Sequence, residues 1–276
     1  MPELSDDPRI PAAFTRRLHD LHGKQFDAMG SCIEVAAKAL ELPRRDNLQR
    51  VARSLVASMT NSTTAVGVLC RYGHGADAIR IARGMFEVLV TLRYLIARPA
   101  ELRDYLEFDC VSRRERLQFY NTNRPALYDS FPVSKKAEVE QEYQRVKGRF
   151  LDSRNKVRRS WCKHTIAQMA EVAGLTELYA LFYFYASAIH HASPMGLGML
   201  IKGESLEIEP APQLAHVGIA LRLAIHALAE ALRSYGKLNG VDFESLLKAA
   251  ENSADEDSLH HDTPVIGSLA EVFPQT

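Results

Sequence analysis

The sequence predicts an all-α protein, because apolar side chains recur every three or four residues along most of the chain. No stretch alternates strand patterns with helix patterns, and the sequence contains no clean internal repeat. The 276 residues, 46% hydrophobic and 25% charged, suffice for a sizeable core. We therefore predict a single multi-helix bundle domain of about eight or nine helices over residues 1–252.

The sequence pattern predicts four helices with recognisable ends in the first part of the chain. Pro43 closes the first helix, and Asp46 followed by Gln49 is a plausible cap for the second. The third helix is strongly apolar and ends before Pro99, since the residue before a proline disfavours helical geometry. The expected ranges are 10–42, 46–73, 76–97 and 100–122.

The pattern after residue 122 predicts further helices on either side of one irregular stretch. A polar, charge-rich helix is expected over residues 134–159. Residues 193–212 contain three Pro and three Gly, which predicts a loop or a small hairpin near 199–209. Residues 253–276 are expected to form an acidic, weakly structured tail. Other helices are expected at 164–173, 175–191 and 213–238, and after Asp242 as a cap.

The overall charge is balanced, with 34 basic and 34 acidic residues, so it requires neither a nucleic acid nor an anionic membrane as partner. The distribution is uneven: residues 145–163 hold eight Lys or Arg and the single acid Asp152. The longest strongly apolar stretch, Leu178 to Ile189, is far shorter than the roughly 20 residues that span a bilayer. We predict no membrane partner.

Four widely spaced cysteines, none in a C-x-x-C arrangement, fit reduced thiols better than a disulfide framework. The acidic N-terminal residues lack the apolar run of a signal peptide. These observations predict a cytoplasmic protein. Apolar faces on the long helices are compatible with a homodimer.

The third predicted helix carries a narrow charged stripe formed by Arg80, Arg83 and Glu87. Their spacings of three and four residues place them on one side of an otherwise apolar helix. Such a stripe could be a structural ion pair between helices, and we give that interpretation equal weight. Alternatively, Glu87 orients Arg83 so that an arginine can bind phosphate or carboxylate.

A second stripe follows about a hundred residues later and consists of Tyr179, Tyr183, Ser187, His190 and His191. For each residue alone, a satisfied core network of hydroxyls and imidazole is the more frequent situation. Together with the first stripe, however, these side chains would supply a pocket for proton transfer beside a bound anion. We predict Arg83, Glu87, Tyr183, Ser187 and His190 as catalytic, and Arg80, Tyr179 and His191 as binding residues.

Established motifs for cofactors and metals are missing. Gly73 to Ala78 matches the glycine pattern of dinucleotide sites, but neither a preceding strand nor the later acidic residue is present. The sequence has no G-x-S-x-G, H-E-x-x-H or phosphate-loop motif. We therefore expect no cofactor and no metal.

The basic stretch offers a second candidate surface. Arg158 and Arg159 precede His164 at a spacing that weakly resembles the Arg and His motif of helical HEPN ribonucleases, although such pairs arise often by chance. Trp161 lies between them, so phosphate attraction and base stacking would both be available. A solvated charged face anchored by one tryptophan is the more frequent explanation. We name Arg158, Arg159, Trp161 and His164 as candidate binding residues.

A family resemblance follows from the order of these residues. Gly73, Asp77, Ala78, Arg83 and Glu87, then Trp161, then the series Tyr179, Tyr183, Ser187 and His190 resemble a widespread bacterial family of helical domains of unknown function. The resemblance covers roughly residues 40–235. It implies an all-helical domain in which Arg83, Glu87, Tyr183, Ser187 and His190 act as a unit, and it implies no activity. Arg80 and His191 are not part of the pattern.

Two functions from different classes remain after this survey. The first is a nucleotide- or RNA-directed protein, such as a metal-independent ribonuclease of defence or toxin type, with arginine holding phosphate and histidine moving a proton. The second is a non-catalytic regulatory module that binds a small anionic ligand or a protein partner. The sequence alone does not decide whether the chain is an enzyme.

Overall fold

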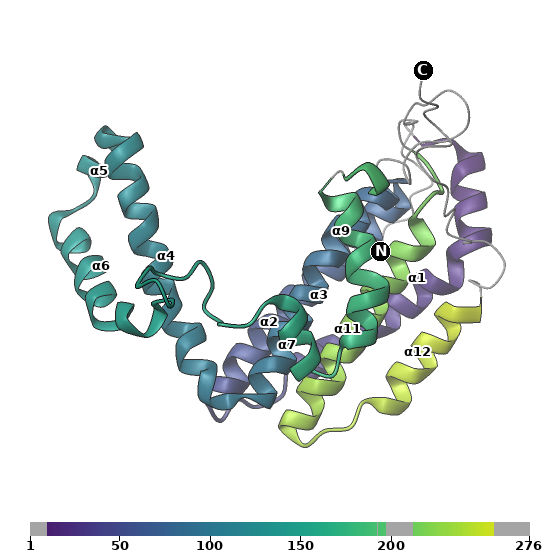
Figure 1. The fold of residues 1–276 in the computed structure, drawn as a ribbon. Coiled ribbons are helices and arrows are strands. Elements are labelled where there is room, and N and C mark those ends of the chain that lie inside the picture. The colour runs from purple at the N-terminus through teal and green to yellow at the C-terminus, as the bar shows by residue number, and fades with distance from the viewer. Residues whose placement is uncertain (1–9, 192, 197–211, 257–276) are drawn as a thin grey trace. The chain divides into compact units, whose positions relative to one another are not determined.

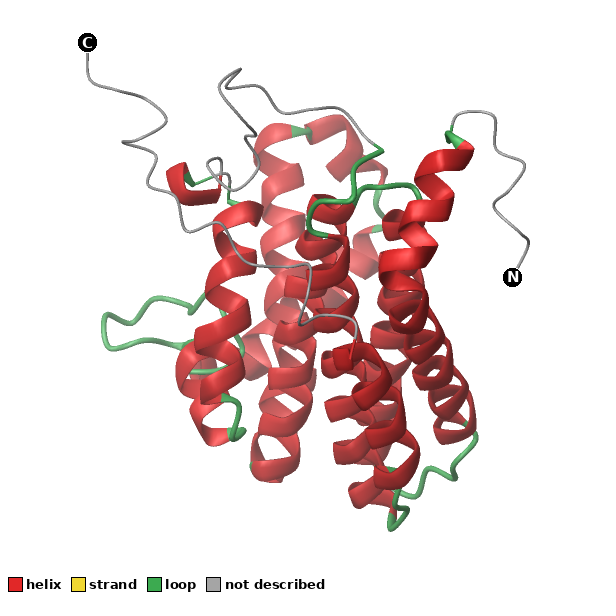
Figure 2. Ribbon diagram, turned by 90° about the vertical axis from the view of Figure 1, so that its right-hand side faces the viewer, coloured by secondary structure: helices red, strands yellow, loops and turns green. Residues whose placement is uncertain are grey.

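The computed structural model describes residues 10–191, 193–196 and 212–256, and it confirms the all-α prediction (Figures 1 and 2). Nine helices of seven or more residues lie in this part of the chain. No strand is present in the described ranges, where the sole β contact is an isolated bridge between Leu151 and Val157. The hairpin predicted near residues 199–209 lies outside the described residues. None of the described helices is long and apolar enough to cross a membrane.

The chain divides into two compact units. The first comprises residues 1–96 and 169–276, as far as they are described, and the second comprises residues 97–168. The single domain over residues 1–252 therefore stays a prediction.

The first unit is built on a central apolar helix, α11, which packs against α1, α2 and α12. Its apolar residues recur every three or four positions, and Leu221, Ile225, Leu228 and Leu232 among them are completely buried. The helix begins later than predicted, since His216 before it adopts a left-handed conformation with φ of 66°. The main helices of this unit are α1 (Ala12–Leu40), α2 (Asn47–Arg71), α3 (Gly75–Ala97), α11 (Val217–Asn239) and α12 (Glu244–Glu256).

Shorter helices complete this unit and carry the second polar stripe. They are α7 (Ile166–Val172), which begins at the end of the second unit, α8 (Thr176–Leu178), the π-helical turn η4 (Tyr179–Tyr183) and α9 (Phe184–His190). The helix predicted over 175–191 is thus present but interrupted by the π turn. A π turn closes hydrogen bonds over five residues and often occurs at functional sites.

The chain passes very close to itself where α3 begins. The amide of Gln213 donates a hydrogen bond of 3.1 Å to the carbonyl oxygen of Gly73. A Cβ atom at Gly75 would lie 2.4 Å from the carbonyl oxygen of Ala215, which is backbone and cannot easily move. Glycine is therefore required here by the approach of the segment that leads into α11.

Paired charges hold α12 against α11. Arg233 of α11 donates hydrogen bonds to both carboxylate oxygens of Glu251, and His226 Nδ1 lies 3.1 Å from Glu251 Oε1. Although burial alone would raise the pKa of Glu251, the hydrogen bonds from His226 and Arg233 hold it at about 2. Arg93 of α3 joins the same network through Glu230, with Nη1 and Oε2 2.7 Å apart.

The second unit consists of short and long helices that pack around a small core of Cys110, Val111, Tyr143, Val146 and Phe150. Phe108 contacts Phe150 edge to face, with ring centroids 5.2 Å apart. Its elements are η2 (Pro99–Glu101), α4 (Leu102–Asn123), α5 (Pro125–Ser130), α6 (Val133–Val146) and η3 (Lys147–Phe150).

The helix predicted over residues 134–159 is wrong beyond Val146, because η3 and a loop follow α6. Asp152 Oδ1 accepts hydrogen bonds of 2.9 Å from the backbone amides of Arg154 and Lys156, which replaces the helical pattern with a turn. Asn155 within this turn has a φ of 58°, a left-handed conformation that ends a helix.

Substitution of Gly75 by alanine should destabilise the protein by about 1 to 3 kcal/mol, because the added Cβ overlaps the backbone at Ala215. Gly84 in the middle of α3 is the matched control, since a Cβ there meets nothing within 4 Å. Gly84→Ala should stabilise the protein by about 0.5 to 1 kcal/mol, because alanine leaves the unfolded chain less conformational freedom than glycine does. Urea unfolding measures both, and an equal effect of the two variants would contradict the close approach.

Glu251→Gln should lower the free energy of unfolding by roughly 3 kcal/mol at pH 7, because Arg233 and His226 lose their anionic partner. A depressed carboxyl pKa contributes stability above the ordinary value of 4.5, and this contribution is lost as pH falls towards about 2. The difference between the variant and the wild type should therefore shrink over that interval. Glu34→Gln is the control, since Glu34 is exposed on α1; a pH-independent difference for Glu251→Gln would refute the linkage.

Candidate functional site

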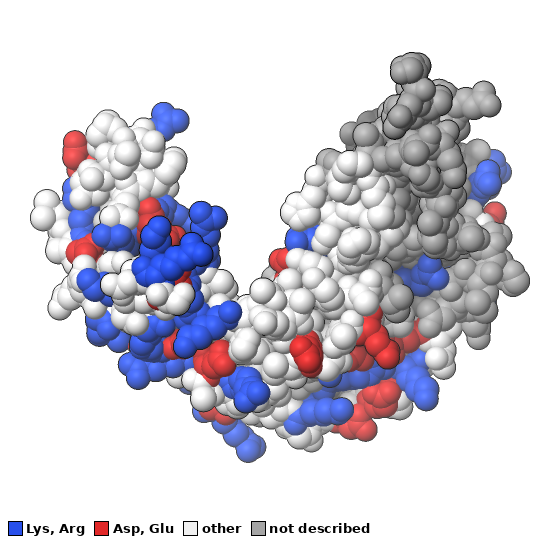
Figure 3. Space-filling model, in the orientation of Figure 1, with Lys and Arg blue, Asp and Glu red and all other residues white. Residues whose placement is uncertain are grey.

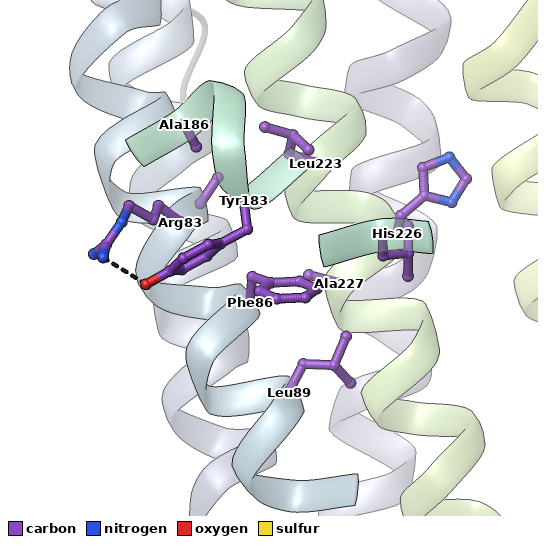
Figure 4. Close-up of a pocket in the computed structure, with 10 residues that line it drawn as sticks. Arg83, Phe86, Leu89, Tyr183, Ala186, Leu223, His226 and Ala227 are labelled. Atoms are coloured by element: carbon purple, nitrogen blue, oxygen red, sulfur yellow. Dashed lines mark hydrogen bonds between the residues drawn. The ribbon is translucent and has the colours of Figure 1, made fainter. Parts of the chain in front are cut away.

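A hydrogen-bonded cluster joins α3 to the segment η4–α9 in the first unit. Arg83 Nε donates to Ser187 Oγ at 3.0 Å, and Arg83 Nη2 donates to the hydroxyl oxygen of Tyr183 at 2.7 Å (Figure 4). The two polar stripes therefore face each other, as the catalytic prediction requires. We refer to Arg83, Glu87, Tyr183 and Ser187 as the Arg83 cluster.

Glu87 completes this cluster one helical turn beyond Arg83. Its Oε1 lies 3.0 Å from Arg83 Nη2 and accepts the hydroxyl proton of Tyr183 at 2.8 Å. Burial, followed by the hydrogen bond to the Glu87 carboxylate, raises the pKa of Tyr183 to about 12. The Tyr183 hydroxyl therefore stays protonated near neutral pH and links the arginine to the glutamate.

Aromatic contacts hold the π turn against α3. The rings of Tyr179 and Tyr183 stack with centroids 5.0 Å apart. Both rings also contact Phe86, at centroid distances of 6.4 Å for Tyr179 and 5.6 Å for Tyr183. Tyr179, predicted as a binding residue, thus packs beside the cluster and supports the ring of Tyr183.

The cluster lies at the protein surface and is only partly closed. The side chain of Arg83 is 13% exposed, whereas that of Glu87 is 41% exposed. Arg83 Nη1 makes no hydrogen bond to any described residue and is not among the buried unsatisfied nitrogens. The guanidinium is therefore fixed through Nε and Nη2 and retains donors on Nη1 that solvent can reach.

His190 lies at the end of α9, in the electrostatic field of Arg83. Its side chain is exposed, and its pKa is lowered by partial burial, then by the charges of Arg83 and His191, with Arg80 adding to the effect and Glu87 opposing it. The rings of His190 and His191 meet edge to face at 4.8 Å. The lowered pKa favours a neutral imidazole at His190 near pH 7.

Arg80 is not part of the cluster. It pairs with Asp77 one turn earlier on α3, and this pair is largely exposed. Its partner Asp77 stands three residues before it on the same helix face, and the role of Arg80 as a binding residue stays a prediction. Arg80 contributes positive potential near His190 rather than a contact to the cluster.

A small cavity of about 20 Å³ lies beside the Arg83 cluster, between α3, η4–α9 and α11 (Figure 4). Apart from Arg83, Tyr183 and His226, its lining is apolar. This volume accommodates about one water molecule. This cavity therefore does not hold a ligand larger than water.

The sequence interpretation missed two residues beside this cavity, Phe86 and His226. Phe86 belongs to the apolar pattern of α3, and nothing in the pattern distinguishes it from core residues. His226 was detectable as a lone histidine among the buried positions of α11, where a polar group requires a partner, here Glu251.

The other four predicted binding residues belong to the second unit. Arg158 donates to the carbonyl oxygens of Trp161 and Arg149, at 3.3 and 3.2 Å. Trp161 contacts Tyr105 edge to face, with centroids 5.2 Å apart. Arg158 and Trp161 thus hold the loop after η3, whereas the side chains of Arg159 and His164 are exposed.

Over the part of the chain that the structure describes, no three His, Cys, Asp or Glu side chains gather closely enough to hold a metal ion. The four cysteines are free and buried. Burial raises the thiol pKa of Cys32 to about 12 and also raises that of Cys70. These thiols are poor nucleophiles, since the thiolate is the reactive form.

The fold and the cluster define a helical protein whose distant helices are joined by a polar site at the surface. The chain belongs to a family of unknown function (DUF5677), whose profile matches residues 49–208. The match confirms the resemblance predicted for roughly residues 40–235 and includes both polar stripes. No curated protein and no solved structure matches the chain. The resemblance to HEPN ribonucleases stays a prediction.

Glu87→Gln should lower the pKa of Tyr183 from about 12, because the nearby carboxylate favours the neutral phenol. Part of the shift should persist, since burial is its largest cause. NMR titration of ¹³C-labelled tyrosine measures this pKa, and Tyr183→Phe assigns the resonance. Asp77→Asn is the control on the same helix, and a Tyr183 pKa that is unchanged in Glu87→Gln would exclude the hydrogen bond.

Proposed function

We propose that the Arg83 cluster binds a phosphate group and that His190 transfers a proton beside it, so that the chain acts as a metal-independent ribonuclease. One observation carries this proposal. Arg83 is held in a single orientation by Ser187, Tyr183 and Glu87, and its Nη1 stays accessible. His190 follows Ser187 by three residues on α9, and the charge of Arg83 contributes to lowering its pKa. This arrangement suits a nucleotide-directed effector of defence or toxin type.

The cluster supports phosphate binding because its arginine is oriented before the ligand arrives. Guanidinium groups bind phosphate through directed, charge-assisted hydrogen bonds, and a fixed guanidinium loses less conformational freedom on binding. Glu87 contacts Arg83 directly through Nη2 and also accepts the Tyr183 hydroxyl proton, so it orients the guanidinium while Nη1 is left for a ligand. The positive charges of Arg80 and Arg83 favour an anion near His190.

RNA cleavage would require a base and a charge acceptor. Neutral His190 would take the proton of the ribose 2′ hydroxyl, whose oxygen then bonds to phosphorus as the bond from phosphorus to the 5′ oxygen breaks. The 5′ oxygen leaves with a proton taken from water. Arg83 Nη1 would stabilise the negative charge that develops on the phosphoryl oxygens. The products are a 2′,3′-cyclic phosphate and a 5′ hydroxyl.

A second candidate is a non-catalytic module that recognises a small anionic ligand or a protein partner. Two observations favour it. The imidazole of His190 makes no hydrogen bond to a described residue that would orient it, and the neighbouring cavity has room for only about one water molecule. The same Arg83 cluster would then bind the anion without transferring a proton.

Incubation of the purified protein with RNA in the presence of EDTA distinguishes the two proposed functions. For a ribonuclease, His190→Ala and Arg83→Ala should each lower the cleavage rate by about 100-fold or more, since each removes a transition-state contribution. His19→Ala, which removes an exposed imidazole from α1, is the matched control and should retain cleavage. The wild-type cleavage rate should rise with pH as His190 loses its proton and should then level off. The midpoint of this rise should lie below 6.5, because the pKa of His190 is lowered from that value.

Thermal unfolding shows whether each variant is still folded. This control is needed because Arg83→Ala leaves Glu87 without its cation and can destabilise the protein, whereas Arg83→Lys keeps a positive charge beside Glu87. Absence of cleavage by folded wild-type protein would exclude the ribonuclease. Stabilisation of that protein by nucleotides or inorganic phosphate, lost in folded Arg83→Lys or Arg83→Ala, would then support the binding module.

A further inference from the structure

The loop between η3 and α7 in the second unit carries four exposed cations. We define this basic loop as residues 151–165. The side chains of Arg154, Lys156, Arg159 and Lys163 are exposed, and none makes an ion pair or a side-chain hydrogen bond with a described residue. Figure 3 shows Lys and Arg gathered on the surface of this unit.

Arginines on the helices of the same unit behave differently, because most of them are paired with carboxylates. Arg103, Arg145 and Arg149 surround Glu107. Arg113 pairs with Asp109 and Glu142, and Arg114 pairs with Glu140. The cations of the basic loop are thus distinguished by the absence of a compensating carboxylate and not by their number.

The one carboxylate within the loop, Asp152, forms no ion pair with any of these four cations. Its Oδ1 atom instead accepts hydrogen bonds from the backbone amides of Arg154 and Lys156. The turn is closed further by the bridge between Leu151 and Val157. Arg158 ties the loop to Arg149 and Trp161 through their carbonyl oxygens. The four cations therefore project from a loop whose backbone is held in place.

We propose that the basic loop is a docking surface for the phosphate backbone of single-stranded RNA. The proposal rests on the proposed function and extends it, since it makes the substrate a polynucleotide and not a mononucleotide. Several unpaired cations on one fixed loop can each neutralise a phosphate and release its counterion, which is the main source of non-specific affinity for nucleic acids.

The composition of the loop disfavours an anionic lipid surface. Large exposed hydrophobic side chains occur elsewhere in the described chain, for example Phe119 and Val133, but none lies in residues 151–165. Stable attachment to a membrane requires apolar insertion together with a basic patch. Trp161 does not supply it, because its ring packs against Tyr105.

Fluorescence anisotropy with a labelled single-stranded RNA of about 20 nucleotides tests the proposal in the full chain. A loop variant in which Arg154, Lys156, Arg159 and Lys163 are all replaced by Gln should bind at least tenfold more weakly at 0.1 M salt. Its slope of log K against log salt should be shallower by about 3, which corresponds to four phosphate contacts at about 0.7 each. Arg83→Ala should change this slope by no more than about 1.

A matched control removes the same charge from the first unit, by replacing Arg16, Arg17, Arg44 and Arg45 with Gln; these residues are exposed. This variant should bind like the wild type, and so should a double variant, Arg154→Lys with Arg159→Lys, which preserves charge. Equal weakening by the loop and control variants would overturn the proposal, as would binding of the wild type to phosphatidylserine vesicles but not to RNA.

The outcomes also separate this proposal from the ribonuclease. RNA binding that depends on the loop, without cleavage, would support the docking surface and exclude the enzyme. Cleavage that requires Arg83 and His190, with RNA binding unchanged in the loop variant, would support the enzyme and overturn the docking surface.

Discussion

The fixed orientation of Arg83 is the constraint on which the candidate site depends. An arginine side chain that is only 13% exposed must be paired, because uncompensated charge in a partly buried position is costly. Glu87 supplies the opposite charge from the same helix. Ser187 and Tyr183, which belong to a second helical segment, accept hydrogen bonds from Arg83 Nε and Nη2. Stability and site geometry therefore rest on the same side chains.

This dual role explains why the structure alone fits both a catalytic and a binding function. The cluster uses Nε and Nη2 of Arg83, whereas Nη1 retains its donors at the surface. Tyr183 adds a neutral hydroxyl that accepts from Arg83 and donates to Glu87 beside their direct contact, and its pKa is raised to about 12. The cluster is thus stable without ligand and still able to bind an anion.

Sequence periodicity predicted the long helices and placed the members of each polar stripe on one helix face, because both follow directly from spacing. It did not show that the two stripes meet, since their contacts join residues about a hundred positions apart. It failed where local hydrogen bonds outweigh periodicity. Asp152 turns the chain at a position where the pattern continued as a helix, and the π turn at Tyr179–Tyr183 leaves no signal in the spacing. The sequence also located the basic stretch, but it could not show that Asp104, Glu107 and Glu142 pair with helical arginines and leave the loop cations unpaired.

The partners in the Arg83 cluster are separated by 96 to 104 positions along the chain, apart from the local pair of Arg83 with Glu87. Contacts of such separation close large loops, so their entropic cost must be met before any stabilisation is gained. Secondary structure in α3 can form early and locally, but the cluster is assembled only after the segment η4–α9 has docked. Fragments that end before Tyr183 retain Arg83 and Glu87 yet contain no site, and a nascent chain acquires it only after most of its length has been synthesised.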